Sequence, residues 1–446
     1  MLALPLASAV AAMFKTSVNI PLNDDYDGIL SYLDHFVHTS GYFARLGWLL
    51  TAEHAKYKLI LLNTVVTLQY VVLGHLNFRA LELLGDLSVP AIIWTLWLLL
   101  ARQRRPLSQA VWLILVPWYL FLSLCYWETV NWTTGEFQAL AVIPLSIGCV
   151  LFFTSSIRHA EIWGTLFLIL SIAANGSGFF LAAALLAVLI YNRRVRAAVL
   201  VILAGCIMAA IYCVHYAGMS DPRPPPHLGV LLAFPFAFLG SIVSTFPWCI
   251  AFGVILVATF VALLTRGWAR VSPETFCIGL FCILTAAAIG PARYHEGLES
   301  AISSRYRMYS LLLLCVEYLA ALQIFTPHRL RLRSAFSAAI GLGAALSISF
   351  AVRSQMSAYR ELHARQRILT AHLILWERHP ERVVAVPEEY LPSKHWEGVR
   401  VIFQNTLQHA IAEDLYRPSV SAWQQLPVKP HSPSTIGIED EPTPTR

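Results

Sequence analysis

The stretch LLGDLSVPAIIWTLWLLLARQRR, residues 83–105, decides the fold class of this chain. Residues 83–101 are predominantly apolar, and Arg102, Arg104 and Arg105 follow directly. An apolar run of about 20 residues is long enough to cross a bilayer as one helix. Arginines that cluster after such a run mark the cytoplasmic side of the membrane. The stretch therefore predicts a membrane-spanning helix that ends in the cytoplasm.

Similar apolar runs recur along most of the chain. Of its 446 residues, 57% are hydrophobic and only 13% are charged, and the mean hydropathy is +0.60. This composition excludes a soluble enzyme, a fibre and a disordered chain. We predict an all-α, polytopic membrane bundle of about eleven spans. The expected spans cover about residues 1–14, 83–101, 108–126, 137–154, 162–175, 178–191, 197–216, 247–265, 275–290, 308–326 and 334–352.

Four basic clusters set the predicted topology. They are Arg102, Arg104 and Arg105; Arg193, Arg194 and Arg196; Arg266 and Arg270; and Arg329, Arg331 and Arg333. If the spans cross in simple alternation, every cluster lies in the cytoplasm. The net charge of +6 is then a topology signal, and we expect no nucleic-acid partner. The eight cysteines lie in apolar segments without CxxC or Cys/His spacing, which indicates neither a disulfide framework nor a zinc site.

Two further apolar segments, residues 58–76 and 228–245, do not fit this alternation. We expect interfacial or re-entrant helices there, and an ordinary span at either position is the alternative. The N-terminal run is about 14 residues long, and we prefer a short first span over a cleaved signal peptide because its positive charge, Lys15, follows the run.

The remaining segments follow from this topology. We expect the N-terminus in the cytoplasm and a first outer loop with interfacial helices at residues 15–82. The transmembrane bundle covers residues 1–352. A small outer helical region covers residues 353–426, because apolar residues recur there at helical spacing. Residues 427–446 are rich in Pro, Ser and Thr, which predicts a disordered tail.

Closely spaced acids open the first outer loop. The segment NDDYDGIL, residues 23–30, places Asp24, Asp25 and Asp27 within four residues. Such carboxylates can bind a divalent cation, Mg or Mn, or supply a general base. The alternative is that Asn23 or Asp24 only caps a helix that begins near Asp27.

Two other groups of polar residues belong to the outer side. Glu53 and His54 offer a carboxylate and an imidazole for proton transfer or metal binding, with a solvated helix start as the alternative. The segment CYWETVNWTTGEFQ, residues 125–138, adds Glu128 among tryptophans and amides. Aromatic faces beside polar groups are typical of a sugar-binding cleft.

Arginines on the outer side are the strongest single feature. The segment GPARYHEGLESAISSRYRMYS, residues 290–310, contains Arg293, Arg305 and Arg307, with Tyr306 between the last two. Positive charge is disfavoured on that side, so these residues need a compensating role. The guanidinium group binds phosphate through a planar fork, which predicts a lipid-borne phosphate as the ligand. The alternative is a structural ion network with the two glutamates of the same segment.

These features resemble, in their order along the chain, the GT-C superfamily of membrane glycosyltransferases. An apolar first span is followed by an outer loop with paired acids, interfacial helices, a many-span bundle and an outer C-terminal region. The segment LGHLNFRALELLGDLSV, residues 73–89, is also similar to the stretch that leads into the second span in bacterial members. The pair EH, the motif NGSG at residues 175–178 and SSRYRMYS resemble a set of largely uncharacterised bacterial multi-pass proteins.

The resemblance implies a glycosyltransferase of the bacterial inner membrane. It would move a sugar from a polyprenyl phosphate or pyrophosphate donor to an envelope glycan or lipid acceptor at the periplasmic face, and membrane lipids would surround it. Asp25, with Asp24 as the substitute, would act on the acceptor hydroxyl. Arg305 and Arg293 would hold the departing phosphate. Arg307 and Tyr306 would assist them.

Two other functions stay open at this point. A transporter or flippase for a lipid-linked anion would use Glu317, an ionisable residue inside an apolar run, as its coupling site. A non-catalytic scaffold of an envelope assembly complex would not depend on the acids or the arginines. Inverted internal repeats, which favour a transporter, are not visible in the sequence.

Overall fold

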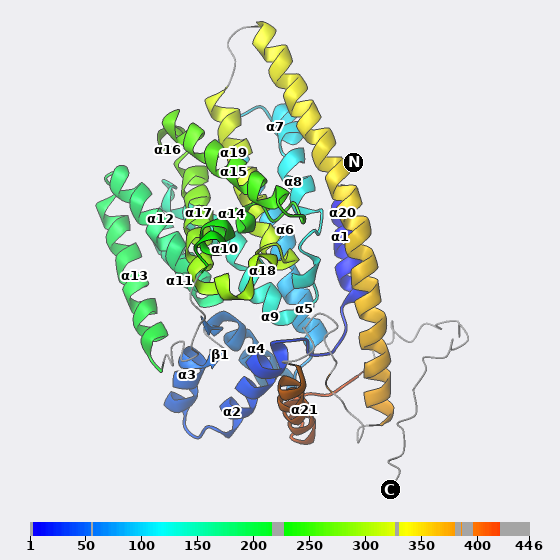
Figure 1. Cartoon of the computed structure of the whole chain (residues 1–446). Coiled ribbons are helices and arrows are strands. Elements are labelled where there is room, and N and C mark those ends of the chain that lie inside the picture. Colours follow the sequence, from blue (N-terminus) through cyan, green and yellow to red (C-terminus); the bar gives the residue numbers. More distant parts are fainter. Residues whose placement is uncertain are drawn as a thin grey trace, which may run out of the picture.

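The computed structural model describes residues 3–54, 57–215, 227–325, 330–379, 385 and 396–419. Most of these residues form helices (Figure 1). The strands in this part of the chain are β1 (Glu53–His54) and β2 (Tyr57–Lys58), which pair antiparallel. The prediction of an all-α bundle is therefore confirmed.

The bundle helices coincide with the apolar runs, because each predicted range overlaps a helix. They are α1 (Ala3–Thr16), α5 (Phe78–Asp86), α6 (Ser88–Ala101), α7 (Leu107–Leu113), α8 (Leu115–Phe121), α10 (Val142–Phe153), α11 (Ala160–Ala174), α12 (Gly178–Tyr191), α13 (Val195–Cys213), α14 (Leu228–Leu239), α15 (Trp248–Thr265), α17 (Pro273–Arg293), α19 (Arg307–Ile324) and α20 (Leu330–Arg378). Among the described residues, seven helical segments are long and apolar enough to cross a membrane. Shorter apolar helices include α4 (Ile60–Leu73) and α14, the two segments that did not fit the alternation.

Apolar side chains on the outside of the bundle agree with a membrane setting. On α13 the exposed residues include Val199, Ile202, Leu203 and Ile207. Exposed apolar surface of this extent is costly in water and favourable against lipid tails. The bundle interior is also apolar, so both faces of these helices are hydrophobic, as expected for helices that lie between lipid and a packed core.

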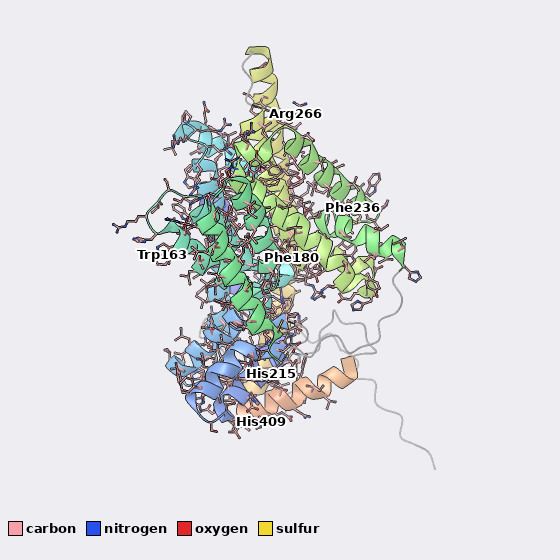
Figure 2. All side chains as sticks on the ribbon, turned by 90° about the vertical axis from the view of Figure 1, so that its left-hand side faces the viewer. Trp163, Phe180, His215, Phe236, Arg266 and His409 are labelled. Atoms are coloured by element: carbon pink, nitrogen blue, oxygen red, sulfur yellow. The ribbon has the colours of Figure 1, made fainter. Side chains whose placement is uncertain are left out.

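The described basic clusters lie together at one end of the bundle, which we call the basic end. Arg102 Nη1 lies 3.2 Å from Glu274 Oε1, and Arg194 Nη2 lies 3.2 Å from Glu161 Oε1. Arg266 lies at the same end in Figure 2, opposite His215 and His409. The side chains of Arg329, Arg331 and Arg333 lie outside the described residues.

The first loop and the chain after α20 pack together at the opposite end, which we call the loop end. It contains α2 (Tyr32–His38), α3 (Tyr42–Thr51), α4 and α21 (Trp396–Ala412), as Figure 1 shows. Tyr26 stacks on Phe403 with ring centroids 4.9 Å apart. His409 Nε2 lies 3.1 Å from Asp34 Oδ1. A buried apolar cluster of its own joins these segments, so the loop end is a second packed unit on the bundle.

Helix α20 connects the two ends. It lies beside α1 and continues past residue 352 into the loop end, so the expected boundary after that residue falls inside one helix (Figure 1). Near its far end, Arg365 donates to the carbonyl oxygens of Trp127 and Val130 at 3.0 and 3.1 Å. Trp376 is buried in the loop-end cluster. The expected disordered tail, residues 427–446, lies outside the described residues.

Helices α14 and α15 approach each other through glycines. A Cβ at Gly253 would collide with the carbonyl oxygen of Phe236, and a Cβ at Gly240 would collide with that of Cys249. Backbone atoms cannot move aside as a side-chain end can. Small residues are the usual means of such close helix packing in membranes.

We expect Gly253→Ala to lower the stability of the purified protein. The extra methyl group forces the two helices apart, and overpacking of this kind costs about 1–3 kcal/mol. Gly205→Ala is the matched control, because a Cβ there meets nothing within 4 Å. Thermal unfolding in detergent should show a lower apparent melting temperature for Gly253→Ala alone. Equal melting temperatures for the two variants would contradict this packing.

Candidate functional site

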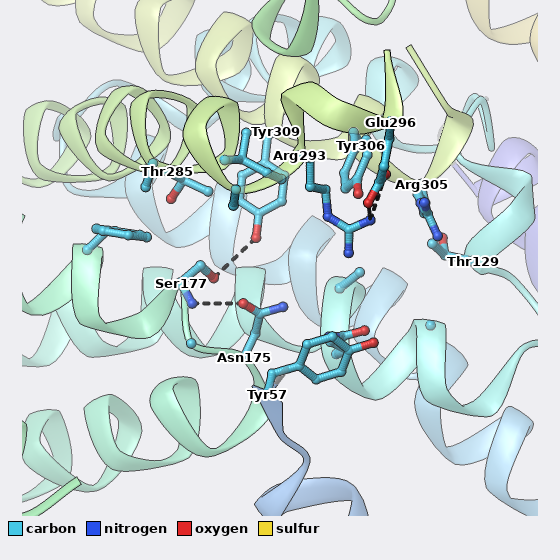
Figure 3. A pocket seen from close by; sticks show the side chains of 18 of the residues that line it. Tyr57, Thr129, Asn175, Ser177, Thr285, Arg293, Glu296, Arg305, Tyr306 and Tyr309 are labelled. Carbon is cyan, nitrogen blue, oxygen red and sulfur yellow. Dashed lines mark hydrogen bonds and ion pairs between the residues drawn. The ribbon is translucent and has the colours of Figure 1, made fainter. Parts of the chain in front are cut away.

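A cavity of about 650 Å³ opens at the loop end of the bundle (Figure 3). Five separate segments of the chain line it: the first loop, the segment that begins in η2 (Trp127–Thr129), the turn between α11 and α12, the end of α17 with the residues that follow it, and the stretch from η5 (Ser304–Tyr306) into α19. Its polar lining residues are Asp24, Tyr57, Thr129, Gln138, Asn175, Ser177, Thr285, Arg293, His295, Glu296, Arg305, Tyr306 and Tyr309. The cavity thus contains one acid of the first loop and two of the three outer arginines that the sequence singled out.

The two arginines lie on either side of one aromatic ring. The guanidinium carbon of Arg293 lies 5.9 Å from the ring centroid of Tyr306, and that of Arg305 lies 5.1 Å from it. Tyr306 is held in place by Phe238, whose ring centroid is 5.2 Å away. Arg293 lies at the end of α17 and Arg305 in η5 (Ser304–Tyr306), so two chain segments present positive charge to one cavity.

The partners of these arginines differ. Arg293 Nη1 lies 3.1 Å from both carboxylate oxygens of Glu296, so part of the expected ion network exists. Arg305 makes no hydrogen bond or ion pair with any described residue, and its Nε is buried without a partner. A half-buried guanidinium without a hydrogen-bond acceptor is costly, since desolvation of a charged donor is normally offset by hydrogen bonds. Arg305 is therefore available to an anion in the cavity.

Asp24 is the acid of the first loop that faces the cavity. Its carboxylate is 38% exposed and lies 3.7 Å from His54 Nε2, and it accepts a hydrogen bond from the Tyr57 hydroxyl at 3.4 Å. Burial acts to raise the pKa of Asp24, but the hydrogen bond and charge of His54 and the charge of Arg305 outweigh burial and lower it. Asp24 is consequently ionised at neutral pH.

His54 holds two of the three clustered acids. Its Nδ1 lies 3.3 Å from Asp27 Oδ2, while its Nε2 faces Asp24. Gly28 permits this approach, because a Cβ there would lie only 3.3 Å from the imidazole. Burial favours the neutral ring, but the hydrogen bonds and charges of the two aspartates outweigh it and raise the pKa of His54 to about 9.

The pKa of His54 predicts a pH-dependent stability. Because the folded-state pKa exceeds the ordinary value of about 6.5, the stabilisation is fully present below pH 6.5 and is lost as the pH rises through 9. The shift corresponds to on the order of 3 kcal/mol. We expect the apparent melting temperature to fall by a few degrees between pH 6.5 and 9.5, and this fall to disappear in His54→Gln.

His38→Gln provides the control for this experiment. His38 also pairs with an aspartate, Asp34, at 3.2 Å, but its side chain is 56% exposed. Solvent screens such a pair, so this variant should keep the wild-type pH dependence. A pH dependence that persists unchanged in His54→Gln would show that another group causes it.

Asp25 faces the protein interior, away from the cavity. Its Oδ1 accepts hydrogen bonds from Thr134 N at 2.9 Å and Thr134 Oγ1 at 2.6 Å, and its Oδ2 accepts one from Leu22 N at 3.0 Å. Burial raises the pKa of Asp25 to about 7, against the opposing effect of these hydrogen bonds. Asp25 thus anchors the first loop to the segment that begins α9 (Thr133–Gly135).

The structure does not support the alternative that Asn23 or Asp24 caps the helix that begins near Asp27. The helical segment that follows, η1 (Tyr26–Ser31), has Asp25 as its N-terminal cap residue, and no side chain accepts a capping hydrogen bond there. Neither Asn23 nor Asp24 caps it. Asp27 is exposed and contributes to the site through His54 rather than from the cavity wall.

The other expected binding residues surround the cavity without lining it. Arg307 Nη1 donates to the carbonyl oxygen of Cys125 at 3.0 Å. Glu128 accepts a hydrogen bond from Ser303 Oγ at 2.8 Å. These contacts fix the segment before α19 against η2, the two pieces that carry Arg305 and Thr129. Glu53 pairs with Lys58 across β1 and β2, next to His54.

Several lining residues were not among the sequence-predicted site residues. Tyr57 follows the Glu-His pair but carries no motif of its own. Asn175 and Ser177 belong to the NGSG motif, which only the family resemblance had noted. Gln138 and Tyr309 lie in the two segments that the sequence singled out, but nothing in their spacing distinguishes them from their neighbours.

A divalent cation at the aspartates, which the sequence left open, has no ligand cluster in the described part of the chain. There, no group of three or more His, Cys, Asp and Glu side chains could hold a metal ion. Asp24 and Asp27, which the sequence offered as ligands, share the His54 side chain instead. A cation between them would lie next to a protonated imidazole, and the like charges would repel.

The described residues thus form a helical bundle with helices long and apolar enough to cross a membrane, and two acids and two arginines line one cavity in it. Comparison of the chain with protein-family models, with curated proteins and with solved structures found no match. We therefore infer the function from the cavity and its residues.

Proposed function

We propose that this chain is a GT-C-like glycosyltransferase of the bacterial inner membrane. About eleven spans would place the basic end in the cytoplasm and the loop end in the periplasm. The protein would move a sugar from a polyprenyl phosphate or pyrophosphate donor to an envelope glycan or lipid acceptor. The observation that carries this proposal is that Arg305, which makes no hydrogen bond or ion pair with any described residue, shares the cavity with an ionised Asp24.

The arginines support the proposal through the chemistry of the leaving group. When the bond between the anomeric carbon and the phosphate oxygen breaks, the electron pair and the negative charge stay on the phosphate. Arg305 and Arg293 would hold that charge, and oriented donors in a partly desolvated site are effective at this task. Because Glu296 already neutralises part of the charge of Arg293, Arg305 would contribute more.

Asp24 supports the proposal through the acceptor. It would take the proton of the acceptor hydroxyl while the oxygen forms the new bond to the anomeric carbon. Attack opposite the departing phosphate inverts the anomeric centre, as the family resemblance implies. His54 would act as a positioning residue, since it contacts Asp24 and Asp27 rather than the cavity.

Mass spectrometry of envelope glycans and lipid-linked sugars tests this proposal. A strain that lacks the gene is complemented with wild type or with Asp24→Asn. We expect one defined sugar to be lost in the deletion strain and restored only by wild type. Complete restoration by Asp24→Asn would contradict the assigned chemistry. Unchanged glycans and lipid pools in the deletion strain would favour the scaffold.

A transporter or flippase is the second candidate, and Glu317 favours it. This residue lies inside α19, is 3% exposed, and its Oε1 has no hydrogen-bond partner among the described residues. Ionisable groups at such positions often couple transport to a proton or ion. Accumulation of an intact lipid-linked precursor in the deletion strain, with restoration by wild type but not by Glu317→Gln, would select this function.

A further inference from the structure

The turn between α11 and α12 forms the wall of the cavity opposite the arginines. In Figure 3, Asn175 and Ser177 lie below the cavity, and Arg293 and Tyr306 lie above it. The turn consists of Asn175, Gly176 and Ser177, and α12 begins directly after it at Gly178. The proposed mechanism gives this wall no role.

The amide of Asn175 presents an unused donor to the cavity. Its Oδ1 accepts a hydrogen bond from the backbone N–H of Ser177 at 2.8 Å, and this contact fixes which end of the amide points away from the turn. The Nδ2 group donates to no described residue, although Asn175 is only half-exposed. A polar group in this position gains stability if a ligand supplies an acceptor.

The turn is held rigidly in this arrangement. Gly178 N donates to the carbonyl oxygen of Asn175 at 2.9 Å, and Ser177 Oγ lies 3.3 Å from the Tyr309 hydroxyl on α19. Gly178 is required where α12 begins, because a Cβ there would lie 2.6 Å from the Cα of Ile172. A preorganised donor loses little freedom when it binds a ligand.

The neighbours of Asn175 match an uncharged, hydroxyl-rich ring. Gln138 and the Tyr57 hydroxyl line the same cavity and can both donate and accept hydrogen bonds. Trp132 and Phe180 add aromatic surface to the lining. Polar groups beside aromatic faces bind sugars, which are polar at their edges and apolar on their faces. No charged group lies in the turn itself, so it would not compete with the arginines for phosphate.

We propose that Asn175, held by the turn Asn175–Ser177, binds hydroxyl groups of a sugar ring and sets which sugar the cavity accepts. This inference rests on the proposed function and assigns the arginines to the phosphate and Asn175 to the sugar. The sugar belongs either to the lipid-linked donor or to the acceptor glycan, because both present the same hydroxyl chemistry to the turn.

A binding experiment on the full-length protein in nanodiscs tests this assignment without transfer. The probes are farnesyl phosphate and its glucose, mannose and arabinose esters. We expect wild type to bind one ester at least ten times more tightly than bare farnesyl phosphate if the sugar belongs to the donor. If it belongs to the acceptor, a free sugar, glucose, mannose or arabinose, should bind to the protein saturated with farnesyl phosphate.

Two variants remove the donor and keep the turn. Asn175→Ser and Asn175→Thr each retain a short side-chain oxygen that can accept from Ser177 N, and neither adds a charge to the cavity. Both should bind farnesyl phosphate within about twofold of wild type and lose the preference for the sugar. Asn192→Ser is the matched control, because this exposed asparagine caps the basic end of α12 and should leave the preference intact.

The outcomes separate the two proposals. An unchanged sugar preference in both Asn175 variants would overturn the role of the turn, and so would a wild type that binds farnesyl phosphate but none of the sugars. Failure of wild type to bind farnesyl phosphate or its esters would instead contradict the proposed function. Sugar binding that depends on Asn175 without phosphate binding would support the turn and contradict the glycosyltransferase.

Discussion

Arg305→Ala should reduce sugar transfer by about 100- to 1,000-fold while the protein still folds and inserts into the membrane. Removal of a single preorganised donor that stabilises developing negative charge has effects of this size. Arg305 makes no hydrogen bond or ion pair with any described residue, so its loss breaks no structural contact of that kind. Transfer from a lipid-linked donor by the protein in nanodiscs gives the rate, and thermal unfolding gives the stability.

Two further variants make the result specific. Arg305→Lys keeps the charge but loses the planar fork, so its transfer rate should lie between those of wild type and Arg305→Ala. Arg196→Ala, at the basic end of the bundle, removes the same charge and should transfer normally. If Arg305→Ala retains the wild-type rate and melting temperature, the phosphate is held elsewhere in the cavity.

The sequence predicts the helices well because all side chains of an apolar run must avoid water, either in the bundle interior or against lipid. The length and hydropathy of residues 83–101 or 247–265 are local properties, and the helices α6 and α15 lie at those places. The three described basic clusters meet at one end for the same reason, since charge cannot remain inside the bilayer. In contrast, the change of composition after residue 352 did not predict that α20 continues as one helix. The part of α20 after that residue packs against the loop end, and this tertiary contact cannot be read from local composition.

The sequence predicts most of the segments that line the cavity, but it does not predict which side chains in those segments face it. Asp24 and Asp25 have the same chemistry and adjacent positions, and two of the three hydrogen bonds that hold Asp25 inward come from the distant Thr134. Likewise, Arg305 and Arg307 lie two residues apart, and Arg307 is directed to the carbonyl oxygen of Cys125. Such choices depend on partners more than 100 residues away in the chain, and no local pattern records them.

The turn at Asn175 is a second case in which the sequence predicts local structure but not the role of a residue. NGSG is predictable as a turn between two apolar runs, because Gly and Asn favour such positions. Its role depends on the end of α17 and the start of α19, which supply the opposite wall. A turn motif therefore predicts local geometry, while the chemistry of the site follows from the tertiary arrangement.

Asp24→Asn and Asp25→Asn should fail in opposite ways. Asp24→Asn removes a carboxylate that faces the cavity, so we expect transfer to fall by about 100- to 10,000-fold, as for loss of a general base. The amide can still accept a hydrogen bond from Tyr57, and the loss of charge beside His54 should lower the stability only modestly. The transfer assay and thermal unfolding, both at pH 7, measure the two effects.

Asp25→Asn should damage stability rather than chemistry. Both oxygens of Asp25 accept hydrogen bonds from fixed N–H and O–H groups of Leu22 and Thr134, so the NH₂ of an asparagine must face a donor whichever way it points. An unsatisfied buried pair of this kind costs about 1–3 kcal/mol. The folded fraction should then transfer sugar at a rate close to that of wild type. If Asp25→Asn instead abolishes transfer at a wild-type melting temperature while Asp24→Asn stays active, the base is Asp25, and the cavity must rearrange to expose it when the acceptor binds.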